Sequence, residues 1–363
     1  MEIPTPDSRL AAAASARQAE LTKPPGALGR LEELACWLAA RLHSPIPDMP
    51  RGEVFVFAAD HGVAARGVSA FPQAVTTQML KNFAAGGAAI NVLAALEQVP
   101  VHVVDVGVAS DEPTPNGVRA ERIRAGTRDL CKEAAMTESE LSRALEVGER
   151  CAREAAGRGA RFLIAGDMGI ANTTAAACLI CALTGATVEE IVGRGTGIDD
   201  AGLERKRTTV HEALARLETV LARTSSDDSR ARQPGVASSE ARQILAHVGG
   251  LEIAAMTGLY CEAARRGMIL VLDGFISSSA ALAAVALQPG TSRWLLASHR
   301  SAETGHGVAL TALGLSPFLD LGMRLGEGTG AVLTLSLIRA ALALHREMAT
   351  FTQAGVSTRA SSA

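Results

Sequence analysis

The sequence predicts an α/β protein built on a doubly wound, mostly parallel sheet. Short continuous apolar runs, the pattern of strands buried on both faces of a sheet, alternate along the chain with longer stretches of helical periodicity. Each apolar run ends in glycine or polar residues. Ligands of doubly wound proteins bind beyond the carboxyl ends of the strands, so these residues are expected to border a ligand site.

Five apolar runs are predicted to be strands. They are residues 54–59, 101–106, 161–165, 268–272 and 293–297. The residues that follow them are, in order, Asp60, Gly107, Gly166-Asp167, Asp273 and Ser298-His299. A carboxylate or imidazole therefore stands after four of the five runs.

Helical stretches occupy most of the remaining chain. The predicted helices are residues 10–20, 30–42, 73–83, 88–96, 138–156, 174–183, 203–223, 251–266, 278–287, 301–313 and 331–345. Pro24 and Pro25 separate the first two because proline cannot continue a helix. Residues 223–240 are rich in Ser, Asp and Arg with almost no large apolar residue, which predicts a solvated, flexible insertion.

The composition excludes several function classes. A hydrophobic content of 48% with 20% charged residues is typical of a globular protein. Aromatic residues make up only 3%, so a base-stacking surface is not expected. The net charge of −3 provides no basic field for a polyanion. We therefore expect no nucleic-acid partner, and any phosphate must be held locally.

The cysteines and the N-terminal sequence predict a cytoplasmic protein. Six cysteines show no disulfide spacing, which favours reduced thiols. Cys178 and Cys181 form a C-x-x-C within an apolar run, where core packing is favoured over redox or metal chemistry. The first residues lack the basic and apolar regions of an export signal, and no uncharged apolar run reaches about 18 residues. No membrane span is expected.

The segment from Leu319 to Gly330 is the first candidate site. It places Glu327 between Gly326 and Gly328, directly before the predicted helix 331–345. Glycines let a ligand approach the main chain closely, and a helix N-terminus favours anionic or polar groups. The alternative is a glycine-rich turn that carries a solvated glutamate.

A second candidate site follows the predicted strand 161–165. Gly169, Asn172 and Thr173 stand at the start of a helix and can cradle a phosphate, with Asp167 at the strand tip. Asn172 or Thr173 can equally be a plain N-cap of that helix.

Residues 193–197 repeat the Gly-x-Gly-Thr-Gly pattern of residues 326–330, and Lys206 follows. As a dinucleotide fingerprint this repeat is weak, because no convincing strand precedes it and its glycine spacing is wrong. Lys206 alone can be a solvated surface charge.

The histidines near strand ends are His61, His299 and His306, and they show no metal-ligand spacing. We interpret them as structural and expect no metal. No Gly-x-Ser-x-Gly elbow is present, which weighs against a serine hydrolase.

Taken together, the motifs resemble the nicotinate-nucleotide–dimethylbenzimidazole phosphoribosyltransferase family. They are KPPGALGRLE (23–32), ADHGV (59–63), GVS (67–69), FPQAVT (71–76), GDMGIANTT (166–174), GRGTGIDD (193–200), LDGF (272–275), SHRSAE (298–303) and LGMRLGEGTGA (321–331). The match is colinear and spans about residues 20 to 347.

The resemblance implies a glycosyltransferase that moves phosphoribose from nicotinate mononucleotide to 5,6-dimethylbenzimidazole. The products are α-ribazole 5′-phosphate and nicotinate, for assembly of the cobalamin nucleotide loop. It also implies a homodimer, no cofactor, a Rossmann-like catalytic domain (45–330), and a small helical domain formed by both chain ends (1–44 with 331–363).

The resemblance also implies roles for particular residues. Glu327 falls on the general base of the family, and Gln78 falls in the benzimidazole-pocket segment. Gly169, Lys206 and Ser301 fall on segments that contact the nucleotide. Asp167 stands where the family commonly has Glu, one methylene longer, so its role as a second carboxylate is open.

Two other functions stay open at the level of the sequence. An NAD-dependent oxidoreductase is suggested by the glycine loops after strands, although no good Gly-x-Gly-x-x-G with a distant acid is present. A non-catalytic nucleotide-binding sensor can use the same type of sheet.

Overall fold

The computed structural model describes residues 2–224 and 236–357 of the chain. Its centre is one six-stranded sheet with the order β3-β2-β1-β4-β5-β6. The strands are β1 (Gly52–Ala59), β2 (Val101–Gly107), β3 (Val118–Ala120), β4 (Phe162–Met168), β5 (Ile269–Leu272) and β6 (Leu295–Ala297). Every neighbouring pair is parallel. This order is the Rossmann arrangement, so the prediction of a doubly wound α/β fold is confirmed.

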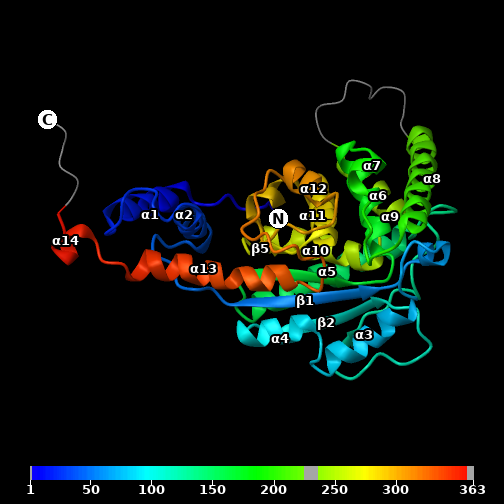
Figure 1. The fold of residues 1–363 in the computed structure, drawn as a ribbon, viewed down its shortest axis with the longest axis horizontal. Coiled ribbons are helices and arrows are strands. Elements are labelled where there is room, and N and C mark those ends of the chain that lie inside the picture. The colour runs from blue at the N-terminus through cyan, green and yellow to red at the C-terminus, as the bar shows by residue number, and fades with distance from the viewer. Residues whose placement is uncertain (1, 225–235, 358–363) are drawn as a thin grey trace.

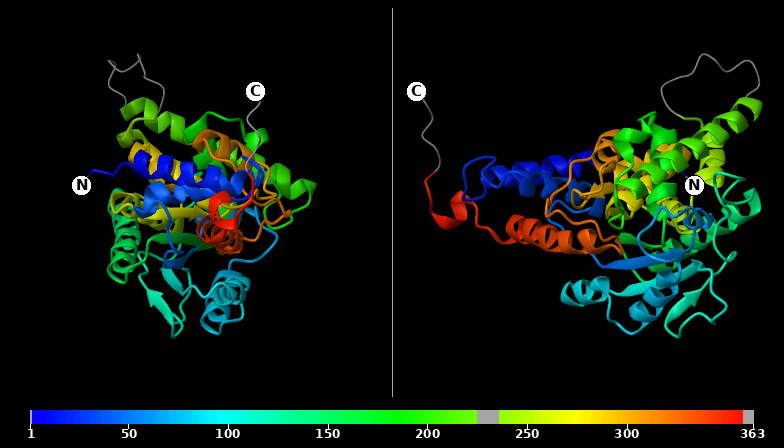
Figure 2. Two further views of the ribbon diagram at one scale, coloured as in Figure 1. Left: turned by 90° about the vertical axis from the view of Figure 1, so that its left-hand side faces the viewer. Right: turned by 45° about the vertical axis from the view of Figure 1, so that its right-hand side comes forward.

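Helices cover both faces of the sheet (Figures 1 and 2). They are α1 (Ser8–Glu20), α2 (Arg30–Leu42), α3 (Ala74–Ala84), α4 (Ala89–Leu96), α5 (Glu138–Gly157), α6 (Asn172–Thr184), α7 (Val188–Ile191), α8 (Asp200–Thr224), α9 (Ser238–Val248), α10 (Leu251–Arg265), α11 (Phe275–Leu287), α12 (His306–Leu313), α13 (Thr329–Glu347) and α14 (Phe351–Ala354), with 3₁₀ turns η1 (Gly62–Arg66) and η2 (Pro289–Trp294). Helices α3 and α4 contact β2 from one side, and α10 packs on the other side (Figure 1).

Burial explains why the strands could be recognised from sequence. All eight residues of β1 are buried, as are the four of β5. A strand covered on both faces must be apolar throughout, which produces the continuous runs. Helix α10 is also buried along almost its whole length. Its small residues allow close packing on α5, since a Cβ added at Gly258 would lie only 2.1 Å from the carbonyl oxygen of Leu145.

The structure corrects several predicted boundaries. Strand β4 continues to Met168, so Gly166 and Asp167 lie within the strand rather than after it. The three-residue edge strand β3 was missed. The helix predicted at 301–313 starts only at His306, because the N–H groups of Ser301 and Ala302 donate to His306 Nδ1 and to the Met323 carbonyl. These differences are shifts within the predicted topology.

Both predicted boundaries of the insertion at 223–240 are wrong. Helix α8 runs to Thr224, and α9 already begins at Ser238. Residues 225–235, which form the middle of the predicted segment, lie outside the described residues. Helix α9 was hidden because its first turn, Ser-Ser-Glu, has the same polar composition as the segment before it.

The two ends of the chain meet at α13. Arg17 donates to the main-chain oxygens of His345 and Arg346, and Gln18 bonds the buried His345 ring at 2.8 Å. Leu21 and Thr350 form an isolated antiparallel bridge. These contacts support a small helical unit built from both ends, although α13 also reaches β4, so we keep the boundaries 1–44 and 331–363 as a proposal.

One apolar stretch has the composition of a membrane span. Among the described residues, Ala74–Leu96 alone combines sufficient length with a mean hydropathy of 1.3. The structure divides it into α3 and α4, of 11 and 8 residues, at a turn where Gly86 has φ 78°. Neither helix has the roughly 20 residues that a bilayer requires.

Candidate active site

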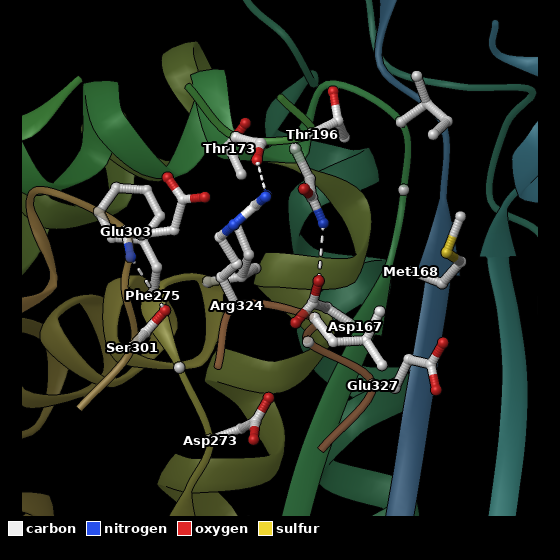
Figure 3. Close-up of a pocket in the computed structure, with 18 of the residues that line it drawn as sticks. Asp167, Met168, Thr173, Thr196, Asp273, Phe275, Ser301, Glu303, Arg324 and Glu327 are labelled. Atoms are coloured by element: carbon white, nitrogen blue, oxygen red, sulfur yellow. Dashed lines mark hydrogen bonds between the residues drawn. The ribbon is translucent and has the colours of Figure 1, made fainter. Parts of the chain in front are cut away.

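A cavity of about 330 Å³ opens at the carboxyl ends of β4 and β5 (Figure 3). Four carboxylates line it: Asp167 from β4, Asp273 after β5, Glu303 from the segment before α12, and Glu327 from the turn before α13. This is the edge of the sheet at which a doubly wound fold binds ligands. Of the strand-end residues, Asp167, Asp273 and His299 line this cavity, whereas Asp60 and Gly107 do not.

Glu327 is held in an uncommon backbone conformation. Its φ is 62°, and the flanking Gly326 and Gly328 have φ 84° and 91°. A left-handed conformation costs a non-glycine residue about 1–2 kcal/mol, so the surrounding structure must fix it. The Glu327 N–H donates to the Asp167 carbonyl at 3.3 Å, and its Oε2 accepts the Ile90 N–H at 3.2 Å.

The surroundings of Glu327 favour the protonated form of its carboxyl, compared with a glutamate in water. The residue is 4% exposed, and burial raises the pKa of its carboxyl above the ordinary value. The Ile90 N–H opposes this shift, whereas the negative charge of Asp273 adds to it. The alternative of a solvated glutamate on a loose glycine turn is therefore wrong.

The N–H groups at the start of α13 do not face a ligand. Those of Gly328, Gly330 and Ala331 donate to Asp273 at 3.3, 2.8 and 3.1 Å. The expected anion site at this helix N-terminus is thus already occupied by a carboxylate from the end of β5.

Asp167 is paired with an amide. Asn172 Nδ2 donates to its Oδ2 at 2.8 Å, whereas the N-cap of α6 is Ala171, with φ 74° and no side-chain cap. The capping alternative for Asn172 and Thr173 is therefore wrong. Burial raises the pKa of Asp167 well above its ordinary value, and the nearby charge of Asp273 acts in the same direction.

Lys206 lies behind the polar wall of the cavity. Its Nζ donates to Thr173 Oγ1 at 2.8 Å and to the Gly193 carbonyl at 3.3 Å, and the side chain is 1% exposed in total. Burial lowers the pKa of Lys206 to about 8. An added Cβ on Gly195 would lie 3.1 Å from Nζ, so only a glycine separates this ammonium from the cavity.

The opposite wall of the cavity is apolar. Phe71, Val75 and Met79 reach it from α3 and the segment before it, together with Met168 of β4. Gln78, which was expected in this region, is exposed on α3 and is not among the lining residues.

Most of the predicted site residues line the cavity. Those that line it are Asp167, Gly169, Asn172, Thr173, Ser301, Gly326 and Glu327. Gln78, Lys206 and Gly328 lie beside or behind it. Thr196, Glu303 and Arg324, which were not predicted as site residues, also line it. All three stand inside the quoted motifs, so the signal was present. Arg324 donates to the Gly195 carbonyl at 2.7 Å and so joins the two glycine-rich segments.

The three histidines make hydrogen bonds within the protein, and His299 also lines the cavity. His61 is fully buried and bonds Glu252 at 2.7 Å. His299 Nδ1 is 3.0 Å from Ser298 Oγ, and His306 lies between Ser278 Oγ and the Ser301 N–H, where burial lowers its pKa to about 3. Within residues 2–224 and 236–357, no three His, Cys, Asp or Glu side chains are arranged to hold a metal.

The fold and the site together define a Rossmann-type enzyme whose cavity has buried carboxylates and an apolar wall. The chain matches the family model described as phosphoribosyltransferase over residues 3–356, and it belongs to this family. It is 54% identical over 345 residues to a nicotinate-nucleotide–dimethylbenzimidazole phosphoribosyltransferase of Chromobacterium violaceum, covering 95% of each chain. The enzyme of the same name from Mycobacterium tuberculosis is 48% identical, with 98% of this chain and 94% of that relative covered.

Two solved structures from Thermus thermophilus are similar along almost the whole chain. One, titled CobT, superposes with a TM-score of 0.87 at 48% identity and covers 96% of this chain and 99% of its own. The other is titled as the same phosphoribosyltransferase and has a TM-score of 0.86 at 47% identity, with 97% and 100% coverage. These relatives give no support to an oxidoreductase or a sensor.

Proposed function

We propose that this enzyme transfers phosphoribose from nicotinate mononucleotide to 5,6-dimethylbenzimidazole. The products are α-ribazole 5′-phosphate and nicotinate, and the reaction supplies the nucleotide loop of cobalamin. The observation that carries the proposal is the state of Glu327. One carboxylate oxygen is fixed by Ile90 N–H, while no donor among the described residues reaches Oε1, and the residue lines a cavity with an apolar wall.

The proposed reaction needs one base. A ring nitrogen of the benzimidazole forms a bond to C1′ of the ribose as the bond between C1′ and the pyridinium nitrogen breaks. The electron pair of the broken bond neutralises the pyridinium, so the leaving group requires no proton. The second benzimidazole nitrogen carries a proton that becomes acidic as positive charge develops, and Glu327 accepts it.

The raised pKa of Glu327 suits this role. A base is most effective when its pKa lies near the working pH, and burial moves a carboxyl in that direction. Its fixed backbone also keeps Oε1 in place before the substrate arrives, which reduces the entropic cost of the reaction.

Asp167 is proposed to stabilise positive charge near C1′. The substrate brings a pyridinium cation into a site whose burial disfavours the ionised carboxyl. A nearby cation shifts that balance toward the carboxylate, so Asp167 becomes charged when the nucleotide binds. The carboxylates of glycoside hydrolysis act on a related, positively charged sugar.

The phosphate is proposed to bind at the polar end of the cavity. Thr173, Thr196 and Ser301 present hydroxyls there, and Lys206 supplies a positive charge through Thr173 and across Gly195. Apolar side chains at the other end then accept the benzimidazole. This orientation puts the ribose between them, beside Asp167 and Glu327.

The direct test is to mix the enzyme with nicotinate mononucleotide and 5,6-dimethylbenzimidazole and to measure nicotinate and α-ribazole 5′-phosphate by chromatography. Both products should appear in equal amounts, and nicotinate release should require the benzimidazole. Formation of neither product, or hydride transfer to NAD, would contradict the proposal.

A homodimer in the cytoplasm is also proposed. Val92 and Leu96 on α4 are 64% and 76% exposed, and Phe71 and Leu325 at the cavity rim are more than half exposed. Val92 and Leu96 stand one helical turn apart on α4 and so form a local apolar patch, which is typical of a surface that a partner covers. All six cysteines are free thiols, as in a reducing compartment. Sedimentation equilibrium should give twice the chain mass of 37.5 kDa.

A further inference from the structure

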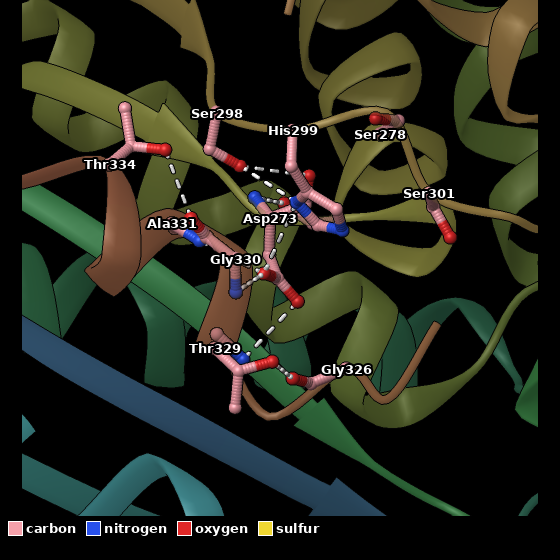
Figure 4. Close-up of polar contacts among 12 residues, drawn as sticks. Asp273, Ser278, Ser298, His299, Ser301, Gly326, Thr329, Gly330, Ala331 and Thr334 are labelled. Carbon is pink, nitrogen blue, oxygen red and sulfur yellow. Dashed lines mark hydrogen bonds and ion pairs between the residues drawn. The ribbon is translucent and has the colours of Figure 1, made fainter. Parts of the chain in front are cut away.

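Asp273 connects the end of β5 to the turn that carries Glu327 (Figure 4). Its Oδ1 accepts the N–H groups of Gly330 and Ala331 at 2.8 and 3.1 Å, and its Oδ2 accepts that of Gly328 at 3.3 Å. The residue is 2% exposed. A carboxylate that accepts three main-chain N–H groups at a helix N-terminus fixes both the helix start and the residue before it.

Asp273 is itself held from behind. His299 Nδ1 lies 3.9 Å from its Oδ1, and Ser277 Oγ accepts the Asp273 N–H at 3.0 Å. Gly330 must be glycine here, since an added Cβ would lie 2.0 Å from His299 Nδ1. The imidazole, the carboxylate and the helix start therefore form one packed unit, with no room for a different turn.

Both carboxylate oxygens of Asp273 are engaged by the main chain, in contrast to Glu327. We propose, on the basis of the proposed function, that Asp273 is a positioning residue that fixes the left-handed turn at Glu327 and so acts on turnover through Glu327. Asp273 lines the cavity, but both of its oxygens accept main-chain N–H groups, so we assign it no contact with the reacting atoms. Glu327 keeps its strained backbone because Asp273 holds the following residues, Gly166 packs against its carbonyl, and Ile90 holds its carboxylate.

The charged and titratable groups that face Asp273 are few. They are Asp167 on β4, Tyr260 on α10, His299 after β6 and Glu327 itself. The charge of Asp273 raises the pKa of Glu327, so a substitution of Asp273 can change kcat through this charge as well as through the position of Glu327. Two variants separate these effects. Asp273→Glu keeps the charge but is one methylene longer and cannot keep all three N–H bonds. Asp273→Asn removes the charge and keeps one acceptor.

The test is a double-mutant cycle on nicotinate release. Asp273→Asn is expected to lower kcat about 10- to 100-fold with KM for both substrates within about 2-fold, since a base displaced by about 1 Å costs that much. Asp273→Glu is expected to lower kcat as well. In the Glu327→Gln background, Asp273→Asn should cost less than about 2-fold, because the residue through which it acts is already disabled.

Asp105→Asn is the matched control. Asp105 is also a fully buried carboxylate that accepts two main-chain N–H groups, those of Gly107 and Val108, at the end of a strand, and it lies outside the cavity. It should lower the melting temperature and leave kcat unchanged, so a loss of kcat specific to Asp273 is not a general effect of removing a buried carboxylate.

Three results would overturn the inference: wild-type kcat in Asp273→Asn, full activity in Asp273→Glu, or an equal loss with and without Glu327. The last result would mean that Asp273 acts directly on the substrate. A wild-type enzyme that releases no nicotinate would instead reject the proposed function, before any variant is compared.

Discussion

The main-chain N–H of Glu327 donates a hydrogen bond of 3.3 Å to the main-chain carbonyl of Asp167. This bond joins the last residues of β4 to the turn before α13, so the two carboxylates are placed relative to each other by the backbone. Their geometry is therefore sensitive to anything that separates β4 from this turn.

Gly166→Ala should disturb that contact. An added Cβ would lie 2.2 Å from the carbonyl carbon and oxygen of Glu327, so the turn must move. We expect a loss of about 1–3 kcal/mol in the free energy of unfolding, as for other overpacked sites, and a fall in kcat. Urea denaturation and steady-state kinetics measure both.

Gly157→Ala provides the control for that variant. Gly157 ends α5 and has no atom within 4 Å of an added Cβ. It should keep full activity and unchanged or slightly higher stability, because alanine favours helix more than glycine does. Normal kcat in Gly166→Ala would show that the turn tolerates displacement.

Lys206→Met should weaken the binding of the nucleotide more than the binding of the benzimidazole. The charge is proposed to act through Thr173 rather than by a direct bond, so the loss should lie near the low end of the about 1.5–3 kcal/mol of a charged hydrogen bond, and KM for nicotinate mononucleotide should rise roughly 10-fold. KM for the benzimidazole, which has no phosphate, should change little. Equal effects on both substrates would argue against a phosphate role.

The pH dependence of nucleotide capture gives an independent check on Lys206. Its pKa of about 8 means that the charge is present below pH 8 and lost above it. Wild-type kcat/KM for nicotinate mononucleotide should therefore fall as the pH rises through about 8, and Lys206→Met should lack that limb. A limb of the same size in the variant would assign it to another group.

Glu252→Gln should destabilise the protein in a pH-dependent way. Burial alone would lower the pKa of His61, but the charge and hydrogen bond of Glu252 outweigh it and raise the pKa. The charged pair is thus complete below the unfolded value of about 6.5 and is lost as the pH rises through the raised folded value. Breaking a fully buried pair costs about 3–5 kcal/mol.

Urea denaturation between pH 6 and pH 9 measures this effect. The difference between wild type and Glu252→Gln should be largest near pH 6 and should shrink as the pH rises. Glu112→Gln breaks the exposed pair with Lys81 and should cost less than about 1 kcal/mol at any pH. A pH-independent difference for Glu252→Gln would show that His61 is not charged.

The sheet could be predicted because parallel strands covered on both faces must be apolar throughout. Five of the six strands followed from that rule. The three-residue β3 is too short to form a run, and its middle residue, Arg119, pairs with Glu154 rather than entering the core. Helix α9 was missed because its polar first turn resembles the neighbouring segment.

The site could be predicted only in part, for a physical reason. Glu327 and Asp167 stand beside glycines, which marks them in the sequence. The role proposed for Asp273 depends on bonds to residues at the start of α13, more than fifty positions away along the chain, and no local pattern encodes them. Likewise, Lys206 lies next to Gly195 of the cavity wall, a neighbour that only the fold brings to it.

The measurement that tests the central claim most directly is the pH–rate profile of nicotinate release by wild type and Glu327→Gln. The raised pKa of Glu327 means that the base is protonated and lost at acid pH, so the wild-type kcat should fall as the pH decreases. Glu327→Gln should lower kcat about 10²–10⁴-fold, leave KM for nicotinate mononucleotide little changed, and abolish the acid limb. A variant with normal kcat, or with the acid limb unchanged, would contradict the assignment of Glu327 as the base.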